Sequence, residues 1–425
     1  MESLSIHEAA KKSGKVTIRG WIHELRDLAN IKFLQLRDIT GIIQCVIKDK
    51  KFFPDFSKLT LETVIQVEGK INKAQIKSEI AIKGVELEVT NLIILNKAEE
   101  LPIQVNEKVQ AGLSKRLDHR SLDIRKPKIQ AIFKIQSTIA NSFREFFYKQ
   151  GFIEIQTPGI IASASEGGTE LFPLQYFEKK AYLAQSPQLY KQLAAISLEK
   201  VFLTLPVWRA EKHNTIRHLN EIRQLDIEVA FADEFVVMKY MEQVVIHIVK
   251  QVIKENKKEL DLLGIKLEVP KAKYMTYKEA IEILQKHKIK IKYGDDLETE
   301  SEKKLCELYK GIVFIHDWPQ TLKPFYIWPK DNKEKTSGGF DALYGGIEIC
   351  SGGQRIHIPE ILEKQLRIKN LNPKDFKWYI DSFKYGAPMH GGWSIGLERL
   401  TMAMLKLDNI REACLFPRDR ERITP

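Results

Sequence analysis

The chain has 425 residues, of which 44% are hydrophobic and 29% charged, the composition of a folded globular protein with more than one domain. It contains no run of about 18 apolar residues and no apolar N-terminal signal segment, so a cytoplasmic protein is expected, with no membrane contact. Four widely separated cysteines give neither a CxxC zinc motif nor a disulfide framework. A net charge of +11 suits an anionic partner such as nucleic acid, although a lysine-rich composition without specific meaning explains it as well.

Short alternating runs separated by glycines occupy residues 15–95. About five strands in this arrangement are typical of a small barrel, and an oligonucleotide-binding barrel is the natural candidate. Exposed aromatic rings on such a barrel stack on unpaired bases, for about 1–3 kcal/mol each. Phe33, Trp21 and His23 are candidates for this role, although the pattern alone favours Phe33 as a core residue.

A polar connector, residues 101–126, precedes a helix that begins at Pro127 and ends before Gly151. Apolar residues at intervals of three and four give this helix one apolar face: Ile132, Ile135, Ile139, Phe143 and Phe146. A short strand and Pro158 follow. Helix, strand and proline in this order occur in many α+β proteins.

Two apolar strands flank a polar loop in residues 201–231, which predicts a long antiparallel hairpin. Arg209 lies at the end of the first strand, and Arg217 and His218 lie where the loop returns. Because arginine donates two parallel hydrogen bonds to phosphate oxygens and stays protonated at neutral pH, this loop is a candidate polyphosphate clamp. The alternative is a solvated hairpin tip with surface ion pairs.

Three further segments carry candidate site residues. Glu166 lies in a glycine-containing loop that would close over a site and receive an ammonium group, or would form an ordinary turn. Gln188 and Lys191 are three residues apart and share one face of a predicted helix. Residues 341–357 contain two carboxylates, Asp341 and Glu348, near a hydroxyl, and oxygen ligands of this kind suit Mg²⁺ beside nucleotide phosphates.

Several of these segments resemble the class II aminoacyl-tRNA synthetases of the aspartyl, asparaginyl and lysyl subclass. WRAE followed by HNTIRHLNE resembles motif 2 of that family, GAPMHGGWSIGLERL resembles motif 3, and the helix, strand and proline of residues 127–158 resemble motif 1. GW with a later Arg, then KFLQLRD and GIIQ, resembles the anticodon-binding domain of the aspartyl-type enzymes. The resemblance covers the whole chain and implies an α+β fold. The implied fold comprises an N-terminal OB-fold β-barrel (residues 1–100), a connector (101–126) and a class II catalytic domain built on an antiparallel sheet flanked by helices (127–425).

The family's functional residues map onto this sequence by motif. The resemblance implies these ATP contacts: Arg209, Glu211, Arg217, His218, Glu348 and Arg399, with Arg209, Glu211 and Arg399 as the catalytic residues. For the amino acid it implies Glu166, Gln188, Lys191, Arg209, Ser351 and Arg355, and for the metal Asp341, Glu348 and Ser351. The implied anticodon contacts are His23, Arg26, Phe33, Gln44 and Glu86.

The resemblance further implies an Mg²⁺-dependent homodimer that uses ATP to attach L-aspartate to tRNA(Asp). Lys191 and Arg355 would provide two cations for one side-chain carboxylate. A neutral amide in their place would leave a buried cation unpaired at a cost of several kcal/mol, which favours aspartate over asparagine. Ile222 stands where aspartyl enzymes often have an adenine-stacking phenylalanine. His23 stands where enzymes restricted to tRNA(Asp) tend to have tryptophan, so charging of tRNA(Asn) as well is a hypothesis. The alternatives are an asparaginyl-tRNA synthetase and a non-catalytic tRNA-binding paralogue.

Overall fold

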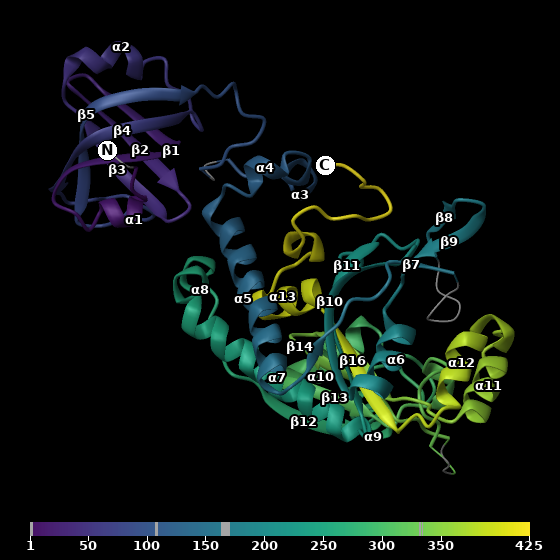
Figure 1. Cartoon of the computed structure of the whole chain (residues 1–425). Helices are drawn as coiled ribbons and strands as arrows, with labels where there is room; N and C mark the ends of the chain where they lie inside the picture. The colour runs from purple at the N-terminus through teal and green to yellow at the C-terminus, as the bar shows by residue number, and fades with distance from the viewer. Residues whose placement is uncertain (1–2, 107–108, 163–170, 331–332, 334) are drawn as a thin grey trace. The chain divides into compact units, whose positions relative to one another are not determined.

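Residues 3–106, 109–162, 171–330, 333 and 335–425 are described by the computed structural model (Figure 1). The chain divides into two units, Met1–Lys126 and Pro127–Pro425. None of the described helices has both the length and the apolar content of a membrane span. Glu166, the residue predicted to receive the ammonium group, lies outside the described residues.

The N-terminal unit is built on a closed five-stranded barrel with the strand order β1-β2-β3-β5-β4. Its strands are β1 (Gly14–Leu28), β2 (Ile31–Asp38), β3 (Gly41–Ile47), β4 (Val64–Lys73) and β5 (Val85–Asn96). Alternate residues of these strands fill the barrel interior, among them Ile18, Leu34 and Ile65. The predicted OB-fold barrel is therefore confirmed, with the last two alternating runs of the sequence joined in β5.

Short helices complete the N-terminal unit. They are α1 (Ile6–Ala9), η1 (Lys50–Phe52), α2 (Phe53–Phe56), α3 (Leu113–Asp118) and α4 (Arg120–Asp123). The polar residues 101–126 thus contain two short helices. They are held by a buried cluster in which Arg120 and Arg116 donate to Asp123 at 2.6 and 2.9 Å.

The C-terminal unit is organised around an eight-stranded sheet with the order β12-β13-β14-β15-β16-β11-β10-β6. These strands are β12 (Lys271–Thr276), β13 (Gly311–His316), β14 (Gly339–Tyr344), β15 (Ile347–Gln354), β16 (His390–Gly396), β11 (Glu221–Ala230), β10 (Lys200–Trp208) and β6 (Ile153–Glu154). The six central strands are antiparallel, as predicted, while β12 and β6 pair in parallel with their neighbours at the two edges. A second sheet has the order β7-β9-β8, formed by β7 (Ile160–Ile161), β9 (Lys179–Leu183) and β8 (Pro173–Tyr176).

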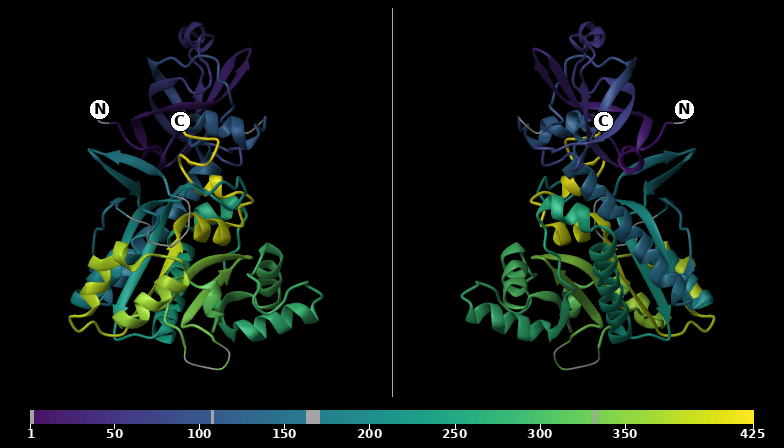
Figure 2. Two further views of the ribbon diagram at one scale, coloured as in Figure 1. Left: turned by 90° about the vertical axis from the view of Figure 1, so that its right-hand side faces the viewer. Right: turned by 90° about the vertical axis from the view of Figure 1, so that its left-hand side faces the viewer.

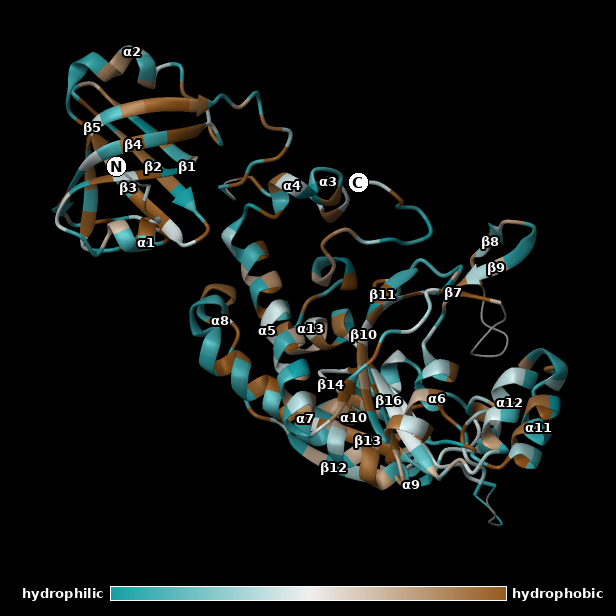
Figure 3. Cartoon of the chain, viewed as in Figure 1, coloured by the Kyte–Doolittle hydropathy of each residue, from teal (hydrophilic) through white to brown (hydrophobic). Residues whose placement is uncertain are grey.

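One face of the large sheet is covered by α5 (Pro127–Lys149), α7 (Glu234–Glu255) and α13 (Leu397–Leu405), beside α8 (Lys257–Leu263). The predicted apolar stripe of α5 is buried there, except that Phe147 takes the fully buried place and Phe146 is only partly buried. From β11, Leu225, Ile227 and Val229 enter the same core. The apolar and polar bands of these helices and strands are visible in Figure 3.

The remaining helices lie toward the two ends of the sheet, as both views of Figure 2 show. At one end α9 (Tyr277–Lys286) packs on β12 and β13, and α10 (Thr299–Leu308) packs on β13, β14 and β15. At the other end α6 (Gln188–Leu198) packs on β10 and β11, near α11 (Pro359–Ile368) and α12 (Lys377–Phe383). The 3-10 turns are η2 (Gln320–Leu322), η3 (Pro373–Phe376) and η4 (Ile410–Ala413). Residues 255–335 are lysine-rich, and their sequence predicts an irregular region with helices only near 278–287 and 302–309. That expectation is wrong beyond the two helices, since the region also supplies α8, β12 and β13.

Candidate active site

A row of polar side chains crosses the sheet on the face opposite α5 and α7. Asp341 of β14 pairs with Ser351 of β15, Ser351 pairs with Ser394 of β16, and Ser394 pairs with Asp226 of β11. Residues directly opposite each other in antiparallel strands project from the same face. Four adjacent strands therefore place carboxylates and hydroxyls in one line.

A β-bulge brings Glu348 to this face. Leu343 lies opposite Glu348, but its neighbour Ala342 lies opposite Cys350, so that Ile349 is the extra residue of β15. Without the bulge, residues 348 and 351 would point to opposite faces; with it, Glu348 and Ser351 share the face of Asp341. Withdrawal from water and the nearby Asp341 carboxylate raise the pKa of Glu348 to about 7.

A cavity of about 120 Å³ opens on the polar face between the β10–β11 loop and α13. Its lining includes seven residues predicted from the motifs: Arg209, Glu211, Arg217, His218, Glu348, Ser351 and Arg399. Ile222, at the place where aspartyl enzymes often have a phenylalanine, also lines the cavity. The structure thus brings together the predicted nucleotide contacts, which come from segments up to 190 residues apart in the chain.

Arg209 stands at the mouth of the hairpin loop, whose two ends are held together by Asn220. The amide of Arg209 donates to the Asn220 carbonyl at 2.9 Å, and the Asn220 side chain donates to the carbonyls of Arg209 and Glu211 at 2.7 and 3.1 Å. The buried Nε of Arg209 has no hydrogen-bond partner among the described residues. A buried donor without a partner costs free energy, so this nitrogen is suited to an anionic ligand.

The other cavity residues are held by short polar contacts. His218 Nδ1 is 2.6 Å from the Thr215 hydroxyl, and burial lowers the pKa of His218. Arg399 donates to the Glu348 carbonyl at 3.3 Å. Glu398, which motif reading alone did not single out, accepts from the Arg223 amide at 3.0 Å, and burial raises the pKa of its carboxyl to about 7.

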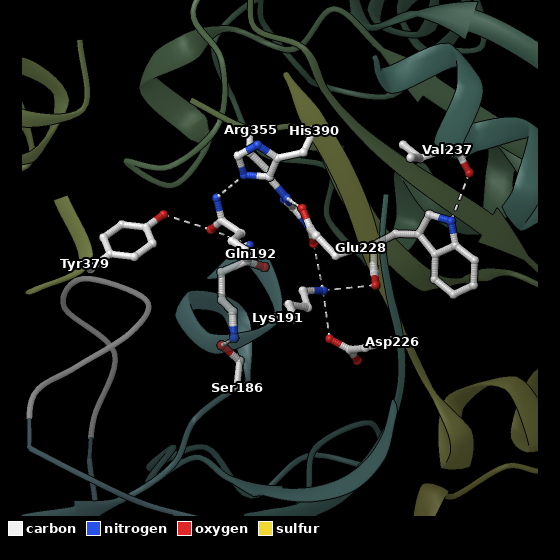
Figure 4. Close-up of polar contacts among 11 residues, drawn as sticks. Ser186, Lys191, Gln192, Asp226, Glu228, Val237, Arg355, Tyr379 and His390 are labelled. Carbon is white, nitrogen blue, oxygen red and sulfur yellow. Dashed lines mark hydrogen bonds and ion pairs between the residues drawn. The ribbon is translucent and has the colours of Figure 1, made fainter. Parts of the chain in front are cut away.

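A second charged group lies beside this cavity, between α6 and the strands β11 and β15 (Figure 4). Lys191 Nζ is 2.8 Å from the Asp226 carboxylate and 3.5 Å from that of Glu228, and it donates to the Trp393 carbonyl at 3.1 Å. Arg355 Nε donates to Glu228 at 2.9 Å. These four charged residues are at most 2% exposed. Lys191 and Arg355 therefore converge, as predicted, and their common partner in the structure is Glu228.

Lys191 and Arg355 already have carboxylate partners in the chain, which corrects the expected charge preference for aspartate over asparagine. It assumed that a neutral ligand would leave a buried cation unpaired, but Lys191 is paired with Asp226 and Arg355 with Glu228. Two cations and two carboxylates of the chain balance before any ligand enters. A ligand with an amide side chain would therefore leave neither buried cation unpaired, and the expected free-energy penalty against asparagine does not arise.

Gln188 belongs to a buried hydrogen-bond network that motif reading missed. Its side-chain Nε2 donates to Gln192 at 2.8 Å, and the same Gln192 oxygen accepts from the Tyr379 hydroxyl at 2.9 Å. The Gln192 nitrogen lies 2.9 Å from Nε2 of His390, whose pKa burial lowers to about 4. A neutral His390 fixes the Gln192 amide (Figure 4), and the Gln192 oxygen in turn orients Gln188. The spacing of four residues between the two glutamines was the available signal.

The predicted metal ligands are two carboxylates and a hydroxyl. Lys323 donates to Asp341 at 2.6 Å and so occupies one carboxylate oxygen. Across the described part of the chain, no group of three or more His, Cys, Asp or Glu side chains could hold a metal ion. Mg²⁺ usually takes one or two carboxylates and completes its shell with water and phosphate oxygens, so Asp341, Glu348 and Ser351 fit it as a nucleotide-bound ion.

In the N-terminal unit, four of the five predicted anticodon contacts lie on adjacent strands. Arg26 of β1 is exposed and pairs with the partly buried Phe33 of β2, and Gln44 of β3 donates to Glu86 of β5 at 2.9 Å. His23 differs. It is the extra residue of a bulge in β1, only 3% exposed, and its Nδ1 is 3.0 Å from Arg37. The structure does not bring His23 to the surface with the other four.

Both units match known families. Residues 112–420 match the model described as tRNA synthetases class II (D, K and N), and residues 16–95 match the OB-fold nucleic acid binding domain. The chain therefore belongs to the class II tRNA synthetases of the D, K and N group.

Similar proteins narrow this further. The chain is 46% identical to the aspartate–tRNA(Asp/Asn) ligase of Methanocaldococcus jannaschii, over 97% of this chain and 95% of that protein. It is also 46% identical to the aspartate–tRNA(Asp) ligase of Thermococcus kodakarensis, over 97% of this chain and 96% of that protein. Among solved structures, the asparaginyl-tRNA synthetase of Pyrococcus horikoshii with asparaginyl-adenylate has a TM-score of 0.93 at 35% identity, with full coverage of both chains.

Proposed function

We propose that this chain is an ATP-dependent aspartate–tRNA ligase, which attaches L-aspartate to tRNA(Asp) through an aspartyl-adenylate. The observation that carries the proposal is the adjacency, on one sheet face, of the arginine-lined cavity and the buried Lys191–Arg355 pair. The cavity would hold the nucleotide, and the pair would mark the end of the amino-acid site.

In the first step the aspartate α-carboxylate attacks the α-phosphate of ATP and pyrophosphate leaves. In the second, the terminal ribose hydroxyl of the tRNA takes the aspartyl group and AMP leaves. Neither step needs a side-chain nucleophile, because phosphoryl-type transfer depends on positioning and charge neutralisation. Arg209, whose Nε has no partner within the described part of the chain, would neutralise charge that grows on the α-phosphate.

Mg²⁺ held by Asp341 and Glu348, with Ser351, would supply further neutralisation of the phosphates. Glu211, which lines the cavity, would orient the adenine or Arg209. Arg217, His218 and Arg399, which line the cavity, would contact the outer phosphates, and burial lowers the pKa of His218. Lys191, Arg355 and the oriented Gln188 would contact the aspartate, and Glu166 its ammonium group.

Aspartate is proposed over asparagine because the relatives at 46% identity are named aspartate ligases, whereas the similar asparaginyl enzyme is 35% identical. The tRNA set is a separate proposal. Arg26, Phe33, Gln44 and Glu86 would read the anticodon, and tRNA(Asn) would be charged along with tRNA(Asp), as the name of the Methanocaldococcus relative states for that protein. Since His23 is buried, an effect on tRNA choice would be transmitted through neighbouring residues such as Arg37.

We also propose a cytoplasmic homodimer. Exposed apolar side chains at the end of α5 and along β6 and β7 support this: Tyr148, Ile153 and Ile160 are 46–55% exposed. Exposed apolar side chains lose contact with water when a second chain covers them, which favours association.

Pyrophosphate exchange into ATP, run separately with aspartate and with asparagine, tests the first step. We expect exchange with aspartate only; exchange with asparagine alone would replace the proposal with the asparaginyl alternative, and exchange with neither would favour a non-catalytic tRNA-binding paralogue. Charging of purified tRNA(Asp) and tRNA(Asn) transcripts then tests the tRNA set, and absence of aspartylated tRNA(Asn) would remove the relaxed specificity.

A further inference from the structure

Arg217 of the β10–β11 loop reaches away from the loop to α10 and to the turn between β14 and β15. One of its terminal nitrogens donates to the Glu302 carboxylate at 2.7 Å and to the Thr299 hydroxyl at 3.1 Å, and the other donates to the Gly346 carbonyl at 3.0 Å. Three acceptors of the chain thus hold the guanidinium that the proposed function assigns to the outer phosphates of ATP.

The loop backbone does not depend on this contact. The amide of Arg217 donates to the Thr215 hydroxyl at 3.1 Å, and Arg411 donates to the Thr215 carbonyl at 3.0 Å and to Asn214 at 2.5 Å. The guanidinium can therefore leave α10 by side-chain rotation while the loop keeps its shape.

Glu302 is a carboxylate with little water around it, since its side chain is 11% exposed. Burial raises the pKa of Glu302, and Arg217 is the strongest opposing influence. If Arg217 moved fully to a phosphate, Glu302 would lose its closest cation while desolvated. If Arg217 stayed and shared its donors, a negative phosphate would lie near a negative carboxylate. In both cases the charge of Glu302 opposes phosphate binding.

Glu302 also faces the space that the phosphates would use. A second cavity, of about 760 Å³, adjoins the nucleotide cavity and is lined in part by Glu302 and by the exposed Glu300. The two cavities share Arg217, His218, Glu348 and Arg399, so the outer phosphates of a nucleotide would lie at their junction.

We propose that Glu302 is a positioning residue that competes with the phosphates of ATP and pyrophosphate for Arg217, and that recapture of Arg217 by Glu302 promotes release of pyrophosphate. This inference rests on the proposed function in taking Arg217 as a phosphate contact. It assigns a role to a residue 85 positions away in the chain, in a segment without a family motif.

The test is Glu302→Gln, which removes the charge but keeps an acceptor for Arg217. We expect the KM for ATP in aspartate-dependent pyrophosphate exchange and the inhibition constant of inorganic pyrophosphate in tRNA charging each to fall about fivefold, with kcat of exchange within about twofold of wild type. Glu302→Asp keeps the charge and should bind neither ligand more tightly. Glu300→Gln removes one negative charge from the same helix turn without touching Arg217, and should leave both constants near wild type.

Opposite results overturn the inference. If Glu302→Gln raised the KM for ATP and the inhibition constant of pyrophosphate and lowered the melting temperature, the contact with Arg217 would be purely structural. If Glu300→Gln changed both constants as much as Glu302→Gln does, the effect would be one of general charge. Calorimetric binding of ATP without aspartate separates the proposed ligase function from the proposed role of Glu302. Tighter ATP binding by Glu302→Gln in a protein that activates neither amino acid would overturn the proposed function alone. Unchanged ATP binding in Arg217→Ala would overturn the inference.

Discussion

Glu398 is a buried carboxylate whose oxygens accept a hydrogen bond from the Arg223 amide, and it is 4% exposed. Burial raises its pKa to about 7, above the ordinary 4.5 of an unfolded glutamate. The folded protein therefore binds this proton more tightly than the unfolded chain, so the stabilisation is complete below about pH 4.5 and is lost as the pH rises through about 7.

Glu398→Gln should remove this pH dependence. The variant should be more stable than wild type at pH 8, by up to about 2–3 kcal/mol, and close to it at pH 5. Urea unfolding at both pH values measures the difference, and Glu282→Gln, an exposed glutamate on α9, serves as the control for a surface charge. Equal stability changes at pH 5 and pH 8 would contradict the assigned cause.

At the scale of single residues, the motifs predicted the residues that line the site better than they predicted the residues that hold them in place. Arg209, His218 and Arg399 meet at one cavity because β16, which leads into α13, pairs with β11 of the hairpin. Asp226 and Glu228, which hold Lys191 and Arg355, were available in the sequence as charged residues at alternate positions of an apolar strand. Glu302 and Lys323 were not, since no local pattern connects residues that meet only after the chain has folded.

At the level of elements, alternation and helical periodicity predicted the barrel, the central hairpin and α5. They could not predict the bulge at residue 349, because no residue type in IEICS marks an extra residue, and this bulge decides that Glu348 faces Asp341. The strands β12 and β13 could not be predicted either, because they lie in a lysine-rich region and their burial depends on the helices packed over them.

Close strand packing at β16 makes an element-scale prediction. Gly392 lies opposite Glu228, and a Cβ at Gly392 would stand 2.2 Å from the Glu228 carboxylate and 2.3 Å from the Ile227 carbonyl. Backbone cannot yield easily in a central strand, so Gly392→Ala should displace Glu228 from Arg355. We expect a loss of stability of about 1–3 kcal/mol and a rise in the KM for aspartate that exceeds the rise for ATP.

Thermal unfolding and pyrophosphate exchange at varied aspartate measure these effects. Gly112→Ala is the control, since a Cβ there meets nothing within 4 Å. A Gly392→Ala protein with equal rises for both substrates would show that the strand as a whole has shifted, and would contradict a local effect on Glu228.

On the scale of the whole molecule, the two units carry separate tasks in the proposed function. The nucleotide cavity and the Lys191 group are formed within Pro127–Pro425, while the five predicted anticodon contacts lie within Met1–Lys126. Adenylate formation requires only the nucleotide cavity and the Lys191 group, and selection of tRNA requires the anticodon contacts. A variant in the barrel should therefore affect one reaction of the chain and not the other.

Phe33→Ala tests this separation in the full chain. Loss of one base-stacking contact, about 1–3 kcal/mol, should lower kcat/KM for charging of tRNA(Asp) by about tenfold to a hundredfold. Aspartate-dependent pyrophosphate exchange, which needs no tRNA, should stay at the wild-type rate. Ile39→Ala, at an exposed apolar position in the β2–β3 turn, is the matched control and should charge tRNA normally. If Phe33→Ala slowed exchange as much as charging, the barrel would be supporting the fold of the whole chain, and Phe33 would be the core residue that its pattern alone first indicated.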